Sequence, residues 1–352
     1  MSGNHSIVIQ APGKAEIVEA PIPKLREDYL IVKVAAVALN PTDVLHIDTF
    51  APVGARVGCD YAGTVEEVGP KVSKAFKKGD RVAGFAHGSN ALHHEDGTFA
   101  EYITVKADLQ LRIPKSVSFE EAATLSLGVI TAGQALFQSL DVPYLDNPAT
   151  EKVPVLIYGG STATGSLAIQ YAKLAGLFVI TTASTHNFDY LKKLGADVVL
   201  DYHSDTVVDD IKKHAGAGQL KNVLDCISTE ATAKICVNAF GEAGGVYSAL
   251  RFVPEELVSA INDKVTLKLK LAYSAIGEAF QFGPLSLPAD PADLEFAKKF
   301  VADTEKLLAE GKLVPHKPTV DEGGSGLGGV LKGLDLVREG KVSGTKLVIT
   351  SR

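Results

Sequence analysis

The chain has 352 residues, of which 46% are hydrophobic and 22% are charged. This composition is typical of a well-cored globular protein of about two domains and excludes a disordered chain. The net charge of -7 does not favour nucleic acid or an anionic membrane surface as a partner. Cys59, Cys226 and Cys236 are too scattered for a disulfide framework, so we expect reduced thiols in a cytoplasmic protein. No apolar run approaches the ~18 residues of a membrane span, and no secretory leader is recognisable.

Short β signals separated by glycine and proline dominate the first third of the chain. Gly58, Gly63 and Gly69 have turn-like spacing within residues 57–69. This pattern predicts a small β-barrel or an open β-domain. The expected strands are residues 6–10, 15–19, 29–39, 81–85 and 98–105.

The pattern changes near Ser118, which is the expected N-cap of a helix over residues 119–125, with Glu121 at the capping-box position. A second helix is expected over 129–140, followed by a loop to residue 152. Apolar strands and helices then alternate, which predicts a parallel sheet covered on both faces. The expected strands are 153–158, 177–183, 198–201, 222–227 and 245–250, and the expected helices are 165–175 and 187–194. A last helix is expected over 293–309, a flexible turn over 323–329 and a closing strand over 346–350.

A glycine loop joins the first of these strands to its helix. Gly160 and Gly165 match the first and last glycines of the G-x-G-x-x-G pattern, whereas Thr162 replaces the middle one. Backbone amides at the start of the helix, with the hydroxyls of Ser161, Thr162 and Thr164, suit a dinucleotide diphosphate. The alternative is a tight strand-to-helix turn that holds no ligand.

The residues after the second parallel strand indicate which dinucleotide is bound. An acidic residue there would hold the ribose hydroxyls of NAD, but the segment reads Ser184, Thr185, His186 and Asn187. This favours NADP(H) over NAD(H). Three nearby residues, Lys192, Lys193 and Tyr202, either approach the 2′-phosphate or form a solvated helix face and an ordinary strand end.

Metal ligands are scarce in this sequence. No Cys-x-x-Cys pair occurs, and the local cluster of His87, His93, His94, Glu95 and Asp96 reads as a solvated loop, so we expect no metal site.

Four motifs in order resemble the medium-chain dehydrogenase/reductase superfamily: residues 58–65, 79–82, 97–102 and the glycine loop. The resemblance spans nearly the whole chain. It implies an α/β fold in which a GroES-like, β-rich catalytic domain (1–128 and 295–352) is combined with a Rossmann domain (129–294) built on a doubly wound parallel sheet.

The superfamily's zinc-dependent members have a Cys ligand where this chain has Asn40 and a His ligand where it has Cys59. The chain therefore resembles the zinc-free branch of quinone oxidoreductases and enoyl reductases. Within that branch, residues 159–164, 184–188 and 224–227 resemble the fungal trans-acting enoyl reductases of highly reducing polyketide synthases, the lovastatin type. Thr185 stands where that family usually has Pro.

This resemblance implies specific site residues. The implied cofactor contacts are Thr42, Asp43, Val44, Leu45, Gly160, Ser161, Thr162, Ala163, Thr164, Ser184, Thr185, His186, Asn187, Tyr202, Leu250, Arg251, Val342 and Ser343. The implied substrate contacts are Thr131, Ala132, Gly133, Gln134, Ala135, Leu136, Phe137, Gln138, Ala272, Tyr273, Ser274, Ala275 and Ile276.

The implied reaction is reduction of an α,β-unsaturated thioester, with a hydride from NADPH to Cβ and a proton to Cα. Thr42, Asn40 and Thr131 are the candidate catalytic donors to the enolate oxygen, although each also has an ordinary structural role. Some mitochondrial relatives carry a Tyr where this chain has Ala51. The proton source is therefore left between Tyr61 and water.

The implied partner is the acyl carrier domain of a highly reducing polyketide synthase, with or without a peptide synthetase module. Lys71, Lys74, Lys77 and Lys78 form either a docking patch for this acidic domain or a solvated turn. We expect a monomer rather than a homodimer, with residues 265–274 as the candidate dimer edge. The alternative functions are a quinone or enone reductase and an NADPH-binding regulatory protein without catalysis.

Overall fold

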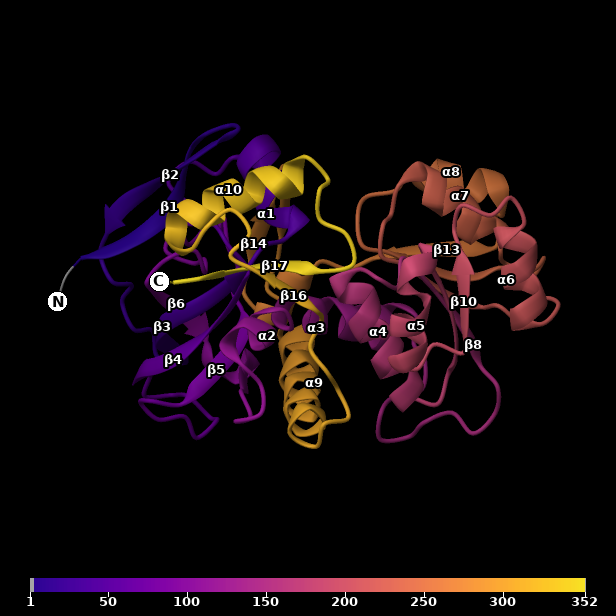
Figure 1. The fold of residues 1–352 in the computed structure, drawn as a ribbon, viewed down its shortest axis with the longest axis horizontal. Helices are drawn as coiled ribbons and strands as arrows, with labels where there is room; N and C mark the ends of the chain where they lie inside the picture. The colour runs from indigo at the N-terminus through magenta and orange to yellow at the C-terminus, as the bar shows by residue number, and fades with distance from the viewer. Residues whose placement is uncertain (1–2, 352) are drawn as a thin grey trace. The chain divides into compact units, whose positions relative to one another are not determined.

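The computed structural model of the chain describes residues 3–351 and shows two compact units (Figure 1). The first unit combines Met1–Ile130 with Tyr273–Arg352, and the second is Thr131–Ala272. The sequence predicts a Rossmann domain over residues 129–294, whereas residues 129–130 and 273–294 belong to the first unit. Side chains of residues 273–294 contact the rest of this unit, because Tyr273 reaches Thr42 and Glu278 reaches Tyr29.

The first unit is built on a seven-stranded sheet. Its strands follow the order β16-β17-β3-β4-β5-β7, and β6 pairs with β3. The C-terminal strand β17 lies antiparallel beside β3, where the yellow and indigo ribbons adjoin in Figure 1. Two hairpins, β1-β2 and β14-β15, complete the strands. The bounds are β1 (Asn4–Ala11), β2 (Lys14–Ala20), β3 (Tyr29–Ala38), β4 (Asp60–Val68), β5 (Arg81–Phe85), β6 (Tyr102–Lys106), β7 (Gln110–Arg112), β14 (Phe280–Phe282), β15 (Leu285–Leu287), β16 (Pro318–Val320) and β17 (Lys346–Thr350).

Short helices connect these strands. The capping box expected at Ser118 and Glu121 is confirmed, because the Ser118 hydroxyl accepts from the Glu121 amide and the Glu121 carboxylate accepts from the Ser118 amide. The helices are α1 (Pro41–Leu45), a π-helical segment (His46–Phe50), α2 (Phe119–Ala123), α3 (Ser126–Gly133), α9 (Pro291–Ala309) and α10 (Gly326–Arg338). The chain continues from α3 into a π-helical segment of the second unit (Gln134–Ser139). Single 3-10 turns lie at Ala107–Leu109 and Ala272–Ile276.

Two sequence expectations for the first unit are wrong. The expected turn over 323–329 is only partly a turn, because α10 begins at Gly326. The glycines of this segment favour a turn, but its apolar residues have helical spacing. Val330 and Leu334, four residues apart, are buried in the core. The strand expected over 98–105 begins at Tyr102, since Thr98 and Phe99 bond instead to the loop at Val57 and Gly58.

A buried ion pair ties the two ends of the first unit together. Lys346 on β17 donates to the carboxylate of Asp60 at the start of β4, and these residues are 4% and 0% exposed. The other partners of Asp60 are the Asn40 side-chain amide at 2.8 Å and the Leu127 backbone amide at 2.6 Å. One carboxylate therefore joins four segments that are distant in the sequence.

The second unit is a six-stranded parallel sheet with strand order β10-β9-β8-β11-β12-β13. The chain starts in the middle and winds outward in both directions, which is the doubly wound order expected from the sequence. The strands are β8 (Pro154–Tyr158), β9 (Phe178–Ala183), β10 (Val198–Asp201), β11 (Asn222–Asp225), β12 (Gly245–Ala249) and β13 (Val265–Leu269). The helices are α4 (Ala163–Leu174), α5 (Phe188–Lys193), α6 (Val207–Ala215), α7 (Glu230–Asn238) and α8 (Glu255–Ile261), with a 3-10 turn at Thr185–Asn187.

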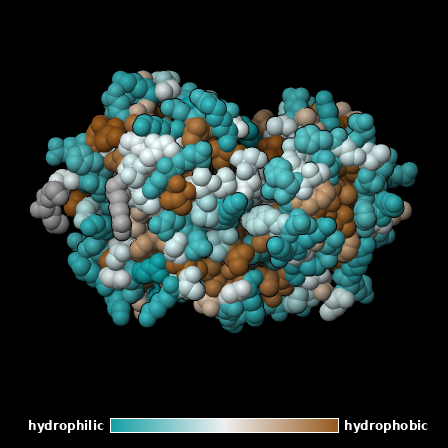
Figure 2. Space-filling view, viewed as in Figure 1, coloured by the Kyte–Doolittle hydropathy of each residue, from teal (hydrophilic) through white to brown (hydrophobic). Residues whose placement is uncertain are grey.

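The surfaces of both units are mainly polar on the face shown in Figure 2, with hydrophobic residues in small separate patches. Phe252 is the most exposed large hydrophobic side chain recorded among residues 3–351, at 82%. Within the same residues, no helix is long and apolar enough to cross a membrane.

We predict that Lys346→Met lowers the free energy of unfolding by about 3–5 kcal/mol, because removal of one partner leaves the other charge buried and unpaired. Urea unfolding followed by circular dichroism measures this change. The control is Lys312→Met, which breaks an exposed pair with Glu310 and should cost no more than about 1 kcal/mol. Equal losses in the two variants would contradict the role given to this pair.

Candidate active site

The one-turn helix α1 holds Thr42 between buried polar residues. Pro41 takes the first helical position, where its missing N–H is not needed. The Asp43 carboxylate accepts a 2.8 Å hydrogen bond from the backbone amide of Asn40, which closes the turn. The side-chain amide of Asn40 donates to Asp60 and, at 3.4 Å, to the carbonyl of Ala38. Asn40 is therefore engaged in holding the turn, whereas Thr42 is only half-buried.

The Thr42 hydroxyl is in contact with two side chains. Its Oγ1 lies 2.8 Å from the hydroxyl of Tyr273 and 3.3 Å from Nδ1 of His46. The same Nδ1 lies 2.8 Å from the backbone carbonyl of Thr42. Tyr273 was expected to contact substrate, and the structure shows that its hydroxyl is committed to Thr42.

Aromatic rings surround Tyr273, which is 4% exposed. His87 stacks on its ring with centroids 4.2 Å apart and an interplanar angle of 23°. His46 meets it edge-on, and His46 in turn makes edge contacts with Phe50 and Phe282. These contacts fix the phenol in place, so its hydroxyl has little freedom to leave Thr42.

Burial changes the protonation of the groups around Thr42. Desolvation raises the pKa of Asp43 to about 7, and the nearby Asp60 charge adds to this, while the Asn40 amide, Lys346 and Cys59 oppose it. Desolvation lowers the pKa of His46, and it lowers that of His87 to about 3, so both rings are neutral near pH 7. Their Nε2 atoms are buried and have no hydrogen-bond partner in the structure.

The side chains at the superfamily's zinc positions do not fit a metal. Burial raises the pKa of the Cys59 thiol well above its usual range, so it is not a ready thiolate ligand. Asn40 and Asp60 are occupied by each other and by Lys346. No group of three or more His, Cys, Asp or Glu side chains within residues 3–351 could hold a metal ion.

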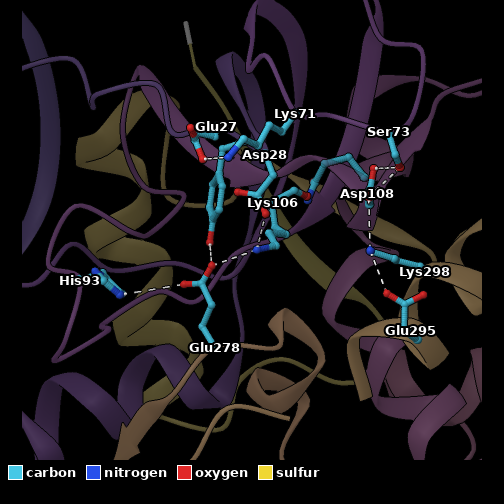
Figure 3. A network of polar contacts seen from close by, with 12 residues as sticks. Glu27, Asp28, Lys71, Ser73, His93, Lys106, Asp108, Glu278, Glu295 and Lys298 are labelled. Atoms are coloured by element: carbon cyan, nitrogen blue, oxygen red, sulfur yellow. Dashed lines mark hydrogen bonds and ion pairs between the residues drawn. The ribbon is translucent and has the colours of Figure 1, made fainter. Parts of the chain in front are cut away.

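A polar network fastens the returning segment 273–298 to the rest of the first unit (Figure 3). Glu278 points toward Lys106 and His93 in this view. The Tyr29 hydroxyl donates to Glu278 at 2.6 Å, and Lys298 lies between Asp108 and Glu295. The segment that carries Tyr273, Phe280 and Phe282 is therefore anchored at several points.

The glycine loop of the second unit packs closely on itself and on β9 before α4 begins. A Cβ on Gly165 would overlap the backbone of Gly159 and Gly160, and one on Gly160 would overlap Thr181. Thr162 is the N-cap: its hydroxyl accepts from the Gly165 amide at 3.0 Å and donates to the Gly159 carbonyl at 2.8 Å. Its hydrogen is therefore used inside the loop, contrary to the expectation that it donates to a phosphate. Three half-buried residues, Ser161, Ala163 and Thr164, line the start of the helix.

The structure brings together two of the residues expected near the ribose. The Ser184 hydroxyl donates to the Tyr202 hydroxyl at 3.3 Å. The side-chain Nδ2 of Asn187 lies 3.1 Å from Nε2 of His186. Thr185 and His186 are exposed. Lys192 and Lys193 on α5 are also exposed, and no ion pair recorded for residues 3–351 includes either of them.

The other residues expected to contact substrate or cofactor differ in how deeply they are buried. Ala132, Gln134, Ala135, Leu136 and Phe137 are buried, whereas Thr131 and Gln138 are half-buried. In the other substrate segment, Ala275 is fully buried and Ser274 donates to Asp293. Arg251 and Ser343 are exposed, and Val342 packs against the core of the first unit. All of these assignments remain predictions.

The lysine cluster is not a free basic patch. Lys71 pairs with Glu27, Lys74 with Glu305 and Lys78 with Glu66. Because three of the four charges are compensated within the first unit, this group does not support a docking site for an acidic domain.

Sequence reasoning missed the side chains that support Thr42. His46 gave no signal as an isolated histidine, and Phe282 and Lys346 are more than 200 residues from Thr42 along the chain. The expectation that His87 and Asp96 belong to a solvated loop is wrong, because they are 3% and 4% exposed. The one available local signal was the Asn40–Asp43 spacing, which is typical of a helix start.

We predict that Asp43→Asn changes the pH dependence of stability. A pKa of about 7 in the folded state and 3.8 in the unfolded state means that folding takes up a proton between these values. Asp43 therefore destabilises the native state increasingly as pH rises from about 4 to 7. Relative to wild type, the variant should gain about 2–3 kcal/mol in free energy of unfolding between pH 5 and pH 8, measured by urea unfolding. Parallel pH profiles would contradict the raised pKa.

Comparison with known proteins identifies the family. Residues 26–115 match the alcohol dehydrogenase GroES-like domain, and residues 163–278 match the zinc-binding dehydrogenase family, whose zinc the side chains described above do not fit. The trans-enoyl reductase TOXD of Cochliobolus carbonum is 49% identical over 301 residues, covering 85% of this chain and 99% of TOXD. The trans-enoyl reductase resD of Aspergillus sclerotiorum is 42% identical over 362 residues, covering 98% and 99% of the two chains.

A solved structure shows the same fold. The mycobacterial protein Rv1454c in complex with NADPH is 22% identical and has a TM-score of 0.74, with 99% of both chains covered. The near-full-length identity to TOXD and resD carries more weight than the fold, because similar folds host many activities. The chain belongs to the trans-enoyl reductase family of the medium-chain dehydrogenase/reductase superfamily.

Proposed function

We propose that the protein is an NADPH-dependent enoyl reductase that acts in trans on α,β-unsaturated acyl thioesters of a polyketide synthase. The observation that carries this proposal is the near-full-length similarity to two trans-enoyl reductases. The zinc-free surroundings of Thr42 support it, because stabilisation of an enolate by hydroxyl and amide donors needs no metal.

The glycine loop fits a dinucleotide diphosphate. The first-turn amides of α4 have no carbonyl partner within the helix, although the Gly165 amide is capped by Thr162. The missing side chains of Gly160 and Gly165 allow the tight loop that brings the strand end to the start of the helix. When bound there, NADPH supplies a hydride for the β-carbon of the substrate. The Gly loop would hold the diphosphate, while Ser184, Tyr202 and Lys192 would surround the 2′-phosphate.

The reaction needs a hydrogen-bond donor to the thioester oxygen and a proton for the α-carbon. The Thr42 hydroxyl donates to the thioester oxygen, whose negative charge grows as the β-carbon accepts the hydride. The α-carbon then takes up a proton. Tyr61 is unsuited to supply it, because its buried hydroxyl donates to Gln110 at 2.7 Å. Water is therefore the proposed proton source.

NADP(H) is the proposed cofactor rather than NAD(H). Ser184, Thr185, His186 and Asn187 offer hydroxyl, imidazole and amide groups without a carboxylate. Lys192 and Lys193 add two exposed positive charges nearby in sequence. This arrangement accepts a phosphate, whereas an acidic residue would repel it.

The proposed partner is the acyl carrier domain of a highly reducing polyketide synthase, with or without a peptide synthetase module. We also propose a cytoplasmic location, which the free thiols Cys59, Cys226 and Cys236 support. The monomer remains the proposed state. The edge strand β13 carries an exposed Lys268, a residue type that disfavours pairing between sheet edges.

The first test follows NADPH oxidation with a crotonyl- or longer 2-enoyl-pantetheine thioester and, in parallel, with a simple quinone. We expect turnover of the thioester and a preference for the longer acyl chain. Turnover of the quinone alone would identify a quinone reductase. NADPH binding without turnover of either compound, even when the thioester is attached to a carrier domain, would identify a non-catalytic binding protein.

We predict that Ser184→Asp raises the KM for NADPH at least about tenfold, because the new carboxylate repels the 2′-phosphate. The KM for NADH should not rise. Ser184→Asn has a similar size without the charge and serves as the matched control. Steady-state kinetics with both cofactors measure the effect, and an equal rise with NADPH and NADH would contradict the phosphate assignment.

A further inference from the structure

The direction of each hydrogen bond at Thr42 follows from the chemistry of its neighbours. The backbone carbonyl of Thr42 is only an acceptor, so Nδ1 of His46, 2.8 Å away, must carry a hydrogen and donate to it. The lowered pKa of His46 leaves a single ring hydrogen, and this contact places it on Nδ1. Nδ1 is then unable to accept from the Thr42 hydroxyl, which lies 3.3 Å away.

In the hydrogen bond between the Tyr273 and Thr42 hydroxyls either oxygen could donate, and the chemistry of the two groups favours the phenol. Among residues 3–351, its polar neighbours are Thr42 Oγ1 at 2.8 Å and the Cys59 sulfur at 3.9 Å. A hydroxyl oxygen is a stronger acceptor than a thiol sulfur, and a phenol is a better donor than an alkanol. The phenolic hydrogen therefore points to Thr42.

With Nδ1 of His46 donating to the Thr42 carbonyl and the phenol donating to Thr42 Oγ1, neither neighbour accepts the hydrogen of the Thr42 hydroxyl. Thr42 is half-buried, while Tyr273, His46 and Asp43 are buried, so Thr42 is the most exposed of these four residues. A donor that itself accepts a hydrogen bond is polarised and donates more strongly.

We infer that Tyr273 is a positioning residue that makes Thr42 a dedicated hydrogen-bond donor to the thioester carbonyl oxygen of the substrate. This inference rests on the proposed function. It assigns to Tyr273 a role in the reaction without direct contact with the reacting atoms. The hydrogen bond from Thr42 to the substrate strengthens as the carbonyl oxygen becomes an enolate oxygen. Weakening of this hydrogen bond should therefore lower kcat.

The experiment compares the wild type with Tyr273→Phe, Thr42→Val and the double variant, all purified as full-length chains. We expect Tyr273→Phe to lower kcat with an enoyl-pantetheine thioester about tenfold, less than the direct loss of an oxyanion donor. The dissociation constant of NADPH, measured by fluorescence titration, should stay within about twofold of wild type. In the Thr42→Val background, removal of the Tyr273 hydroxyl should cost no further activity.

Tyr29→Phe is the matched structural control. It removes another buried phenol, whose hydroxyl anchors the same returning segment by donating to Glu278. We expect its kcat to remain close to that of wild type and its melting temperature to fall at least as far as that of Tyr273→Phe.

Three outcomes would overturn the inference while leaving the proposed function intact. These are equal kcat values for Tyr273→Phe and Tyr29→Phe, a Tyr273→Phe effect that persists undiminished in the Thr42→Val background, and weaker NADPH binding with unchanged kcat. The last result would mean that Thr42 donates to the cofactor. A wild-type protein that does not reduce the thioester would instead refute the proposed function itself.

Discussion

The buried carboxylate of Asp60 is the constraint on which the first unit depends. It meets Lys346 from the C-terminal strand, the side chain of Asn40 before α1 and the Leu127 amide at the start of α3. A charge this deeply buried is tolerated only when it is paired and hydrogen-bonded, so these segments must come together in one arrangement. Because Asn40 opens the helix that carries Thr42, the same arrangement sets the position of the candidate catalytic hydroxyl.

The surroundings of Thr42 combine neutral polar groups with aromatic rings. Burial keeps His46 and His87 uncharged and raises the pKa of Asp43, so the cluster carries little net charge near neutral pH. Such an environment strengthens hydrogen bonds, because little water competes for the donors. It suits the proposed reaction, in which negative charge appears briefly on an oxygen.

In the second unit, the proposed diphosphate site is formed mainly by backbone atoms. Gly160 and Gly165 permit the close packing of the loop, and the Thr162 hydroxyl stabilises the loop from inside. The proposed discrimination between dinucleotides rests on a few residues that follow β9. Ser184 and Tyr202, which are 18 residues apart, are joined there because β9 and β10 are parallel neighbours.

The sequence by itself determined the local features of this protein. The capping box at Ser118, the glycine loop, the alternation of strands and helices and the motif order that indicates the family all depend on residues that are close along the chain. Its failures have a physical cause as well. The glycine-rich start of α10 does not indicate a helix locally, because the helix is stabilised by burial of Val330 and Leu334 in the core. The sequence suggests a basic patch at Lys71, Lys74 and Lys78, but each of these lysines is paired with a glutamate in the tertiary structure. Only the tertiary structure brought Tyr273 to Thr42 and Lys346 to Asp60, because contacts between residues more than 200 positions apart leave no periodic or local pattern in a single sequence.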